Sequence, residues 1–259
     1  MHTKPIGIFD SGVGGTSIWS ALNQRLPHED TIYLADSKNS PYGTKTQQEI
    51  IQLSIKNTKH LIANDCKLIV VACNTATTNA IKILREKFTI PFIGIEPAIK
   101  PAALHTKTKA IGILATRGTL SSELFHRITD LYSHNVKVLE QEGAGIVQLI
   151  ESGQLESEAM TQLLKQYLQP MIAANVDHLV LGCTHYPYLI PQLKKLLPPE
   201  VKIIDSGEAV ARQTEYILNQ HQLLNTQSNK AKCLFYTNTQ TKVLASLIEQ
   251  PAQVHYLDF

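Results

Sequence analysis

Apolar and polar positions along the chain predict an alternation of strands and helices. Compact apolar runs rich in Val, Ile and Leu end on small or turn-forming residues, and stretches with helical spacing of apolar positions separate them. We expect strands at 6–9, 31–35, 67–72, 90–95, 110–115, 136–139, 178–182 and 201–204. We expect helices at 16–26, 47–64, 77–88, 145–151 and 156–174. This alternation is typical of an α/β protein with parallel sheets.

The pattern of strand endings occurs twice. Residues 67–76 and 178–186 are both apolar runs that end on a cysteine followed by small polar residues, with the cysteines 183 − 73 = 110 positions apart. Residues 110–115 repeat 5–10 at an offset of 105, and 204–206 repeat 95–97 at an offset of 109. We infer an internal duplication. It predicts two pseudo-symmetric, doubly wound α/β lobes with mainly parallel sheets and an active site in the cleft between them.

The C-terminal part, from about residue 208, differs from both repeats. It predicts a helix at 210–224, a turn at 225–230, a strand at 233–236, a helix at 242–248 and a strand at 254–257. We expect these elements to complete the first sheet and to carry no chemistry. The expected lobes are therefore 1–96 plus 208–259, and 97–207.

Composition narrows the class of protein. The 259 residues are 43% apolar and 18% charged with a net charge of +2, which favours a globular protein without a nucleic-acid or membrane partner. The apolar runs are too short to span a bilayer, and the N-terminus leads directly into a strand without room for a signal peptide. Four cysteines without a CxxC pair indicate free thiols in the cytoplasm.

The two strand-end cysteines, Cys73 and Cys183, are the candidate reactive groups. Open α/β sheets place ligands at the carboxyl ends of their strands, so facing lobes would present both thiols to one ligand. A thiol has a reference pKa near 8.5 and needs a neighbouring group to take its proton. Asp10 ends the strand expected beside that of Cys73, whereas His185 and Glu151 belong to the second lobe. Opposed acid–base groups suit removal of a proton from one face of a carbon and its return to the other.

Structural interpretations of the same residues remain open. Buried cysteines are usually inert, as we expect for Cys66 and Cys233. Asp10 could cap the following helix, His185 could be a core histidine, and Glu151 could be solvated. A zinc site from Cys73, Cys183 and His185 is disfavoured because close-spaced ligand pairs are lacking. The glycines after Asp10 lack the spacing of a dinucleotide fingerprint and favour a tight turn.

Several motifs together resemble the bacterial glutamate racemase family. They are Asp10-Ser11-Gly12-Val13-Gly14-Gly15, Pro41-Tyr42-Gly43, Ala72-Cys73-Asn74-Thr75-Ala76, Glu151-Ser152-Gly153 and Gly182-Cys183-Thr184-His185-Tyr186-Pro187. The cysteine motifs are common to the wider aspartate/glutamate racemase superfamily, whereas the opening motif and the Pro-Tyr-Gly loop point to glutamate. The resemblance covers residues 6 to about 236.

The resemblance implies an isomerase without a cofactor that interconverts L- and D-glutamate and supplies D-glutamate for peptidoglycan synthesis, hence for cell wall biogenesis and cell shape. It implies that Cys73, assisted by Asp10, acts on the D-enantiomer, and that Cys183, assisted by His185 and Glu151, acts on the L-enantiomer. The expected substrate contacts are Ser11, Pro41, Tyr42, Gly43, Asn74, Thr75, Thr116, Thr119 and Thr184. A homodimer remains open, because dimers occur in this family.

Three other functions compete with this one. A racemase for aspartate or a hydantoin would share the cysteine motifs. A thiol hydrolase or amidase would use Cys183 as nucleophile and His185 as base, but it has no need of a second thiol. A regulatory protein could keep the fold without catalysis, although the complete set of chemical groups speaks against that.

Overall fold

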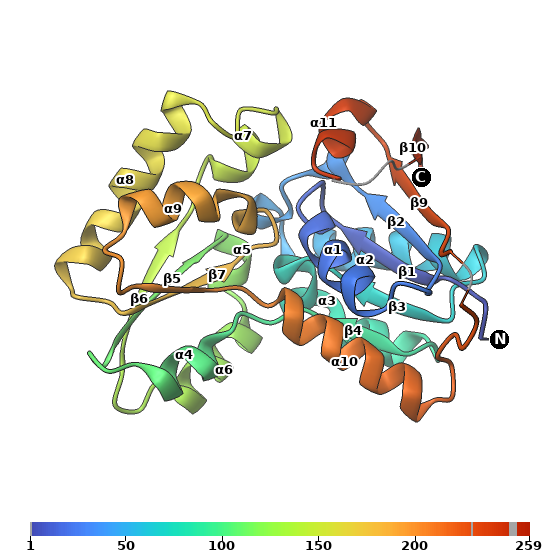
Figure 1. Cartoon of the computed structure of the whole chain (residues 1–259), viewed down its shortest axis with the longest axis horizontal. Coiled ribbons are helices and arrows are strands. Elements are labelled where there is room, and N and C mark those ends of the chain that lie inside the picture. Colours follow the sequence, from blue (N-terminus) through green and yellow to red (C-terminus); the bar gives the residue numbers. More distant parts are fainter. Residues whose placement is uncertain (1, 229, 249–252) are drawn as a thin grey trace.

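The computed structural model describes residues 2–228, 230–248 and 253–259, and it consists of two α/β lobes side by side (Figure 1). Position 229, within the turn expected at 225–230, lies outside the described residues. The first lobe contains a six-stranded parallel sheet in the order β10-β9-β2-β1-β3-β4. Its strands are β1 (Ile6–Asp10), β2 (Thr31–Ala35), β3 (Leu68–Val71), β4 (Phe92–Gly94), β9 (Cys233–Thr237) and β10 (Gln253–Tyr256).

The second lobe repeats the core of the first. Its parallel sheet has the order β6-β5-β7-β8, with β5 (Ala110–Ala115), β6 (Lys137–Glu142), β7 (His178–Gly182) and β8 (Lys202–Ile204). This order matches β2-β1-β3-β4 strand for strand. The predicted fold class of two pseudo-symmetric α/β lobes with parallel sheets is confirmed, and the offsets near 105–110 residues reflect the equivalent strands.

Helices cover both faces of each sheet. Those of the first lobe are α1 (Thr16–Arg25), α2 (Gln47–Ala63), α3 (Asn74–Lys87), α10 (Gly207–Gln220) and α11 (Thr241–Ser246). Those of the second are α4 (Ile99–His105), α5 (Arg117–Leu120), α6 (Glu123–Tyr132), α7 (Ile146–Glu151), α8 (Glu158–Ala173) and α9 (Ile190–Leu196). In the second lobe α4 and α6 lie on one face of the sheet, and α8 and α9 lie on the other (Figure 1).

Buried apolar strands form the core of each lobe. Every residue of β1, β2, β3, β5 and β7 is buried, as expected for central parallel strands covered on both faces. The C-terminal strand β9 pairs with β2 and extends the first sheet outward. Its Phe235 packs edge-on against Trp19 of α1, with ring centroids 4.8 Å apart.

Two helical features differ from expectation. Helix α3 begins at Asn74 rather than near residue 77, because the Sγ of Cys73 accepts a hydrogen bond from the backbone N–H of Ala76 and caps the helix. The short helices α4, α5, α6 and α9 had no counterpart among the expected elements. No helix within the described ranges combines the length and the apolar character needed to cross a bilayer.

The lobes are joined by two crossovers in the described chain, near residues 95–98 and 205–206. The hydroxyl of Ser206 donates a hydrogen bond of 2.6 Å to the carbonyl of Glu96, so the two crossovers are tied together. We propose that the domain boundaries lie at these crossovers, with 1–96 plus 208–259 as one unit and 97–207 as the other.

Candidate active site

The two strand-end cysteines line one enclosed cavity between the lobes. The cavity has a volume of ≈ 240 Å³, and Cys73 and Cys183 are only 4% and 7% exposed. Its lining consists of Ser11, Pro41, Tyr42, Gly43, Cys73, Asn74, Thr75, Thr116, Val147, Cys183, Thr184 and His185. The carboxyl ends of β3 and β7 therefore face a common space, which is how the duplication brings the two thiols to one ligand.

Cys73 is connected to Asp10 through Ser11. The Cys73 thiol donates to Oγ of Ser11 at 3.6 Å, and that hydroxyl donates to Oδ1 of Asp10 at 3.5 Å. Burial and the negative charge of Asp10 raise the pKa of Cys73 well above its ordinary value. The thiol is therefore the resting form of Cys73, and its proton has a path toward a carboxylate.

Asp10 is fully buried at the end of β1, which pairs with the Cys73 strand β3 as predicted. Burial raises the pKa of this carboxyl to about 6, although His185 and the N–H of Gly15 favour the ionised form. The Gly15 N–H donates to Oδ2 at 2.7 Å, so Asp10 also binds the start of α1. A carboxyl with this pKa can accept or release a proton near neutral pH.

Cys183 has a different partner. Its Sγ lies 3.7 Å from Nδ1 of His185, and Nε2 of His185 lies 2.6 Å from Oε1 of Glu151. Burial alone would lower the pKa of His185, but the hydrogen bonds and charges of Cys183 and Glu151 hold it well above the ordinary value. The geometry therefore favours an imidazolium between a sulfur and a carboxylate, an arrangement that stabilises a thiolate.

Glu151 reaches His185 from the end of α7 and is held by the first lobe. Its Oε1 accepts a hydrogen bond of 2.7 Å from the N–H of Val13, in the glycine-rich turn after β1. A Cβ on Gly12 would overlap the Glu151 carboxylate, and a Cβ on Gly14 would overlap the His185 ring. The glycines of this turn thus make room for two side chains of the opposite lobe.

The Pro-Tyr-Gly loop forms another wall of the cavity. Tyr42 is 1% exposed, and its hydroxyl donates 2.6 Å to Oδ2 of Asp36 and accepts from Asn57 at 3.1 Å. Gly43 lies so close to Thr116 of the second lobe that a Cβ would be 2.8 Å from that side chain. The loop therefore closes directly onto the facing lobe.

Hydroxyl and amide groups complete the lining. Thr75, Thr116 and Thr119 form a ring of hydrogen bonds across the lobes, with Oγ1–Oγ1 distances of 2.8, 3.1 and 3.3 Å. Asn74 is buried, yet neither polar atom of its amide has a hydrogen-bond partner within the described parts of the chain. Because buried amides are normally paired, Asn74 is suited to bind a ligand.

Most residues selected from the sequence meet at this cavity, and three lie just behind its lining: Asp10, Glu151 and Thr119. Sequence patterns did not indicate Val147 in the lining, or Ser37 and Asp36 behind it. Val147 lies four residues before Glu151 on α7, so helical spacing could have indicated it. Ser37 follows the end of β2 directly, and its position at a strand end was the only signal.

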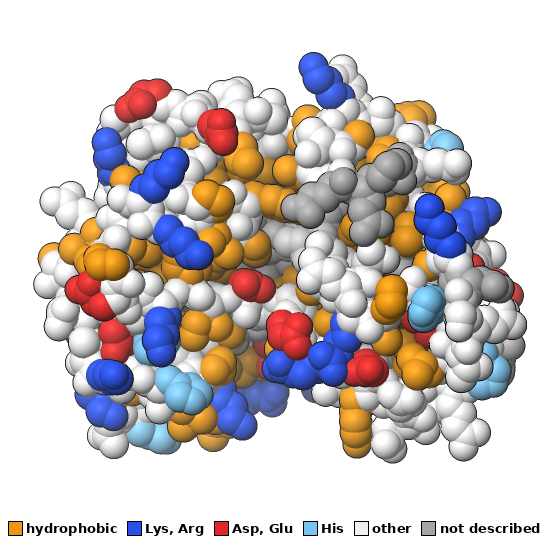
Figure 2. All heavy atoms as spheres, in the orientation of Figure 1, with side chains coloured by type: hydrophobic (Ala, Val, Ile, Leu, Met, Phe, Trp, Pro, Cys, Tyr) orange, Lys and Arg blue, Asp and Glu red, His pale blue; other side chains and the backbone are white. Residues whose placement is uncertain are grey.

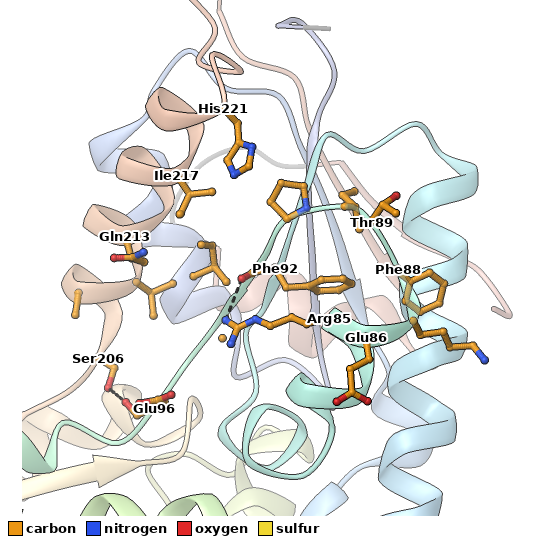
Figure 3. A pocket seen from close by; sticks show the side chains of 17 residues that line it. Arg85, Glu86, Phe88, Thr89, Phe92, Glu96, Ser206, Gln213, Ile217 and His221 are labelled. Atoms are coloured by element: carbon orange, nitrogen blue, oxygen red, sulfur yellow. Dashed lines mark hydrogen bonds between the residues drawn. The ribbon is translucent and has the colours of Figure 1, made fainter.

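A larger hollow of ≈ 1640 Å³ lies elsewhere, between α10, the end of α3 and β4 (Figure 3). Its side chains include Arg85, Gln213 and His221, and it contains none of the candidate residues. Figure 2 shows acidic and basic side chains interspersed over both lobes on the face it displays. Chemistry rather than size therefore identifies the site at the two thiols.

Comparisons with known proteins give matches over most of the chain. The family model for Asp/Glu/hydantoin racemase matches residues 12–214. A glutamate racemase of Herpetosiphon aurantiacus is 46% identical over 238 residues, which cover 92% of this chain and 94% of that protein. A glutamate racemase isoform of Bacillus anthracis superposes with a TM-score of 0.87 at 31% identity, covering 100% and 98% of the two chains. The Francisella tularensis glutamate racemase, solved with D-glutamate, gives 0.86 at 30% identity with the same coverage.

Proposed function

The chain belongs to the Asp/Glu/hydantoin racemase family and is an amino-acid racemase that acts on glutamate, and we propose that Cys73 and Cys183 are the two bases of the reaction. One observation carries this proposal. Two buried thiols face the same cavity, and each is backed by a chain of polar groups that ends in a carboxylate. A hydrolase would need only one of these assemblies.

Conversion of L-glutamate begins at Cys183. The Cys183 thiolate, stabilised by the imidazolium of His185, removes the α-proton and becomes a thiol. The Cys73 thiol then gives its proton to the opposite face of the planar carbanion and becomes a thiolate. One C–H bond is broken and one is formed, so the product is D-glutamate and no oxidant is needed.

Conversion of D-glutamate uses the same groups in reverse. Asp10 accepts the proton of Cys73 through the hydroxyl of Ser11, so that the Cys73 thiolate can remove the α-proton of D-glutamate. Cys183, which takes a proton from the imidazolium of His185, then returns a proton to the other face. Because Asp10 has a pKa of about 6, it is ionised at neutral pH while remaining a competent proton acceptor.

The enclosed site supplies the stabilisation that a weak carbon acid requires. Neutral donors surround the cavity, namely the hydroxyls of Ser11, Thr75, Thr116 and Thr184 and the amide of Asn74. We propose that they bind the two carboxylates of glutamate, with Thr119 supporting Thr75 and Thr116 from behind. Pro41, Tyr42 and Gly43 close the wall above the substrate. Fixed dipoles in a site closed to water stabilise the charge that develops at the α-carbon.

The test is an incubation with L-glutamate in heavy water without an added cofactor. Proton NMR should show loss of the α-proton signal, and circular dichroism should show decay of optical activity. Cys73→Ala should abolish racemisation in both directions, whereas Cys233→Ala, at a half-buried cysteine outside the cavity, should retain it. An active Cys73→Ala enzyme would overturn the two-thiol scheme, and a covalent acyl group on Cys183 would support a hydrolase.

The cellular role and the oligomeric state of the enzyme can also be inferred. We propose that the enzyme supplies D-glutamate for peptidoglycan synthesis in the cytoplasm and that it forms a homodimer. The exposed apolar side chains of Leu104 and Leu131 are 67% and 60% exposed on the second lobe and support such an association. Sedimentation velocity at increasing protein concentration tests the dimer.

A further inference from the structure

Ser37 contacts the catalytic assembly of the opposite lobe. It begins the 3₁₀ turn Ser37–Asn39 directly after β2, and its hydroxyl donates a hydrogen bond of 2.9 Å to Oε2 of Glu151. The other oxygen of that carboxylate, Oε1, is shared between His185 and the N–H of Val13. Every partner of Glu151 other than His185 among these contacts therefore comes from the first lobe.

Two hydrogen bonds to different oxygens fix the plane of a carboxylate. With Val13 alone, the Glu151 carboxylate could rotate about its last side-chain bond and turn Oε1 away from His185. The hydroxyl of Ser37 holds Oε2 and so prevents this rotation. The short contact between Glu151 and His185 at 2.6 Å requires such an orientation.

The turn that presents Ser37 is itself anchored in the core. Asp36 is fully buried, and its carboxylate accepts hydrogen bonds from Tyr42, Asn39 and Asn238 at 2.6–2.8 Å. Its N–H donates 3.0 Å to the carbonyl of Asp10. Asn238 follows β9, so the C-terminal segment, which was expected to carry no chemistry, helps to hold this turn.

We propose that Ser37 is a positioning residue for the half of the reaction that uses Cys183. It acts through Glu151, which orients the His185 imidazolium that stabilises the Cys183 thiolate. The inference rests on the proposed two-thiol function and extends it to a residue outside the motifs. Cys73 has its own path through Ser11 and Asp10, so loss of Ser37 affects the two proton transfers unequally.

Rate constants alone cannot reveal this inequality. L- and D-glutamate have equal free energies, so kcat/KM must remain equal in the two directions in every variant. Isotope effects can separate the directions, because α-deuterated L-glutamate reports on proton removal by Cys183 and α-deuterated D-glutamate reports on removal by Cys73. The observed isotope effect is large when removal of the labelled proton is the slow step. It is small when the other proton transfer is the slow step.

The experiment compares Ser37→Ala with two controls. Ser37→Ala should lower kcat/KM about tenfold, the effect of losing a hydrogen bond to a charged group. Its deuterium isotope effect should increase with labelled L-glutamate and decrease with labelled D-glutamate. Ser37→Thr keeps the hydroxyl, and its two isotope effects should equal those of the unaltered enzyme. Ser40→Ala removes a hydroxyl from the same loop that has no partner within the described residues, and it should resemble the unaltered enzyme.

The outcomes separate the inference from the function on which it rests. Unchanged isotope effects in Ser37→Ala, or equal increases in both directions, would overturn the positioning role while leaving the racemase intact. The same loss in Ser40→Ala would also overturn it, because the effect would then come from the loop rather than the hydroxyl. Absence of deuterium exchange from either enantiomer in the unaltered enzyme would instead refute the two-thiol function.

Discussion

Glu151 packs its carboxylate against the bare Cα of Gly12, so closely that a Cβ at position 12 would overlap Oε1. The contact joins the turn after β1 to the end of α7, and it lets Val13 donate to the same oxygen. A side chain on Gly12 would displace the group that orients His185. The glycine-rich turn, which superficially resembles a nucleotide-binding loop, is thus explained by contact between the lobes.

Gly12→Ala should therefore impair catalysis strongly without unfolding the protein. Displacement of Glu151 by about 1 Å should reduce kcat/KM roughly a hundredfold, as expected when a catalytic group is misplaced. Steady-state kinetics with both enantiomers measures the loss. The matched control is Gly207→Ala, because its Cβ would lie 3.1 Å from the carboxylate end of the Asp205 side chain, outside the cavity, and activity should persist. Full activity in Gly12→Ala would show that the position of Glu151 is unimportant.

Asn74→Ala should stabilise the free enzyme while weakening substrate binding. The buried amide of Asn74 has no partner in the described chain, so its removal relieves a desolvation cost and should raise the free energy of unfolding by about 1 kcal/mol. Loss of its contacts to glutamate should raise KM about tenfold. Urea denaturation and initial-rate kinetics measure the two effects. A destabilised variant with an unchanged KM would contradict a role in binding.

Protonation of Asp10 should make kcat/KM decrease at acid pH, which gives the pH profile an acid limb. With a pKa of about 6, its carboxyl is mostly protonated below that pH and can no longer accept the proton of Cys73. We expect kcat/KM to fall about tenfold per pH unit below about pH 6, measured in buffers of constant ionic strength. Asp10→Asn should be much less active and should lack this limb. An unshifted limb in Asp10→Asn would assign it to another group.

The same pKa makes a prediction for stability. Asp10 has a higher pKa in the folded protein than its ordinary value of 3.8, so the native state binds the proton more tightly than the unfolded state. The contribution of Asp10 to the free energy of unfolding should therefore decrease by about 3 kcal/mol as pH rises from about 4 to about 6. Urea denaturation across this range, compared with Asp10→Asn, isolates the contribution.

A buried ion pair far from the cavity should matter for stability alone. Nζ of Lys67 lies 2.5 Å from Oε2 of Glu29 and also donates to the carbonyls of His2 and Leu223. Lys67→Met leaves a buried carboxylate without its cation and should destabilise the fold by roughly 3–5 kcal/mol. Lys4→Met breaks an exposed pair with Asp65 and should cost less than about 1 kcal/mol. Urea denaturation compares them, and equal losses would contradict the dependence on burial.

The parts of the fold that local pattern determines were predictable. Strands such as β5 and β7 are apolar runs with clear ends, and the repeated cysteine after a buried strand located both thiols. Helix α9 was missed because it spans only 7 residues, too few to show a helical period. Helix α6 was missed although Phe125 and Thr129, four residues apart, form a buried stripe. For α6 the signal was present, whereas for α9 tertiary packing rather than propensity forms the helix.

The parts of the site that depend on contact between the lobes were not predictable. Ser37 and Glu151 are 114 positions apart in the chain, and no local property of either residue indicates the other. The same holds for Asn238, which reaches Asp36 across 202 positions. The sequence could locate residues at strand ends, but only the folded chain shows which of them contact one another across the lobes.

Under the proposed two-thiol scheme, the deep burial of both thiols makes the protonation state of the free enzyme depend on the last substrate it converted. In that scheme, once L-glutamate has become D-glutamate, Cys183 holds a proton and Cys73 does not, so the free enzyme is in the form that accepts the D-enantiomer. Before it can accept another L-glutamate, Cys183 must lose its proton and Cys73 must gain one. With Cys73 and Cys183 only 4% and 7% exposed, bulk water has little direct access to either sulfur. The scheme then requires that the protons which restore the starting form pass through Ser11 and Asp10 on one side and through His185 and Glu151 on the other.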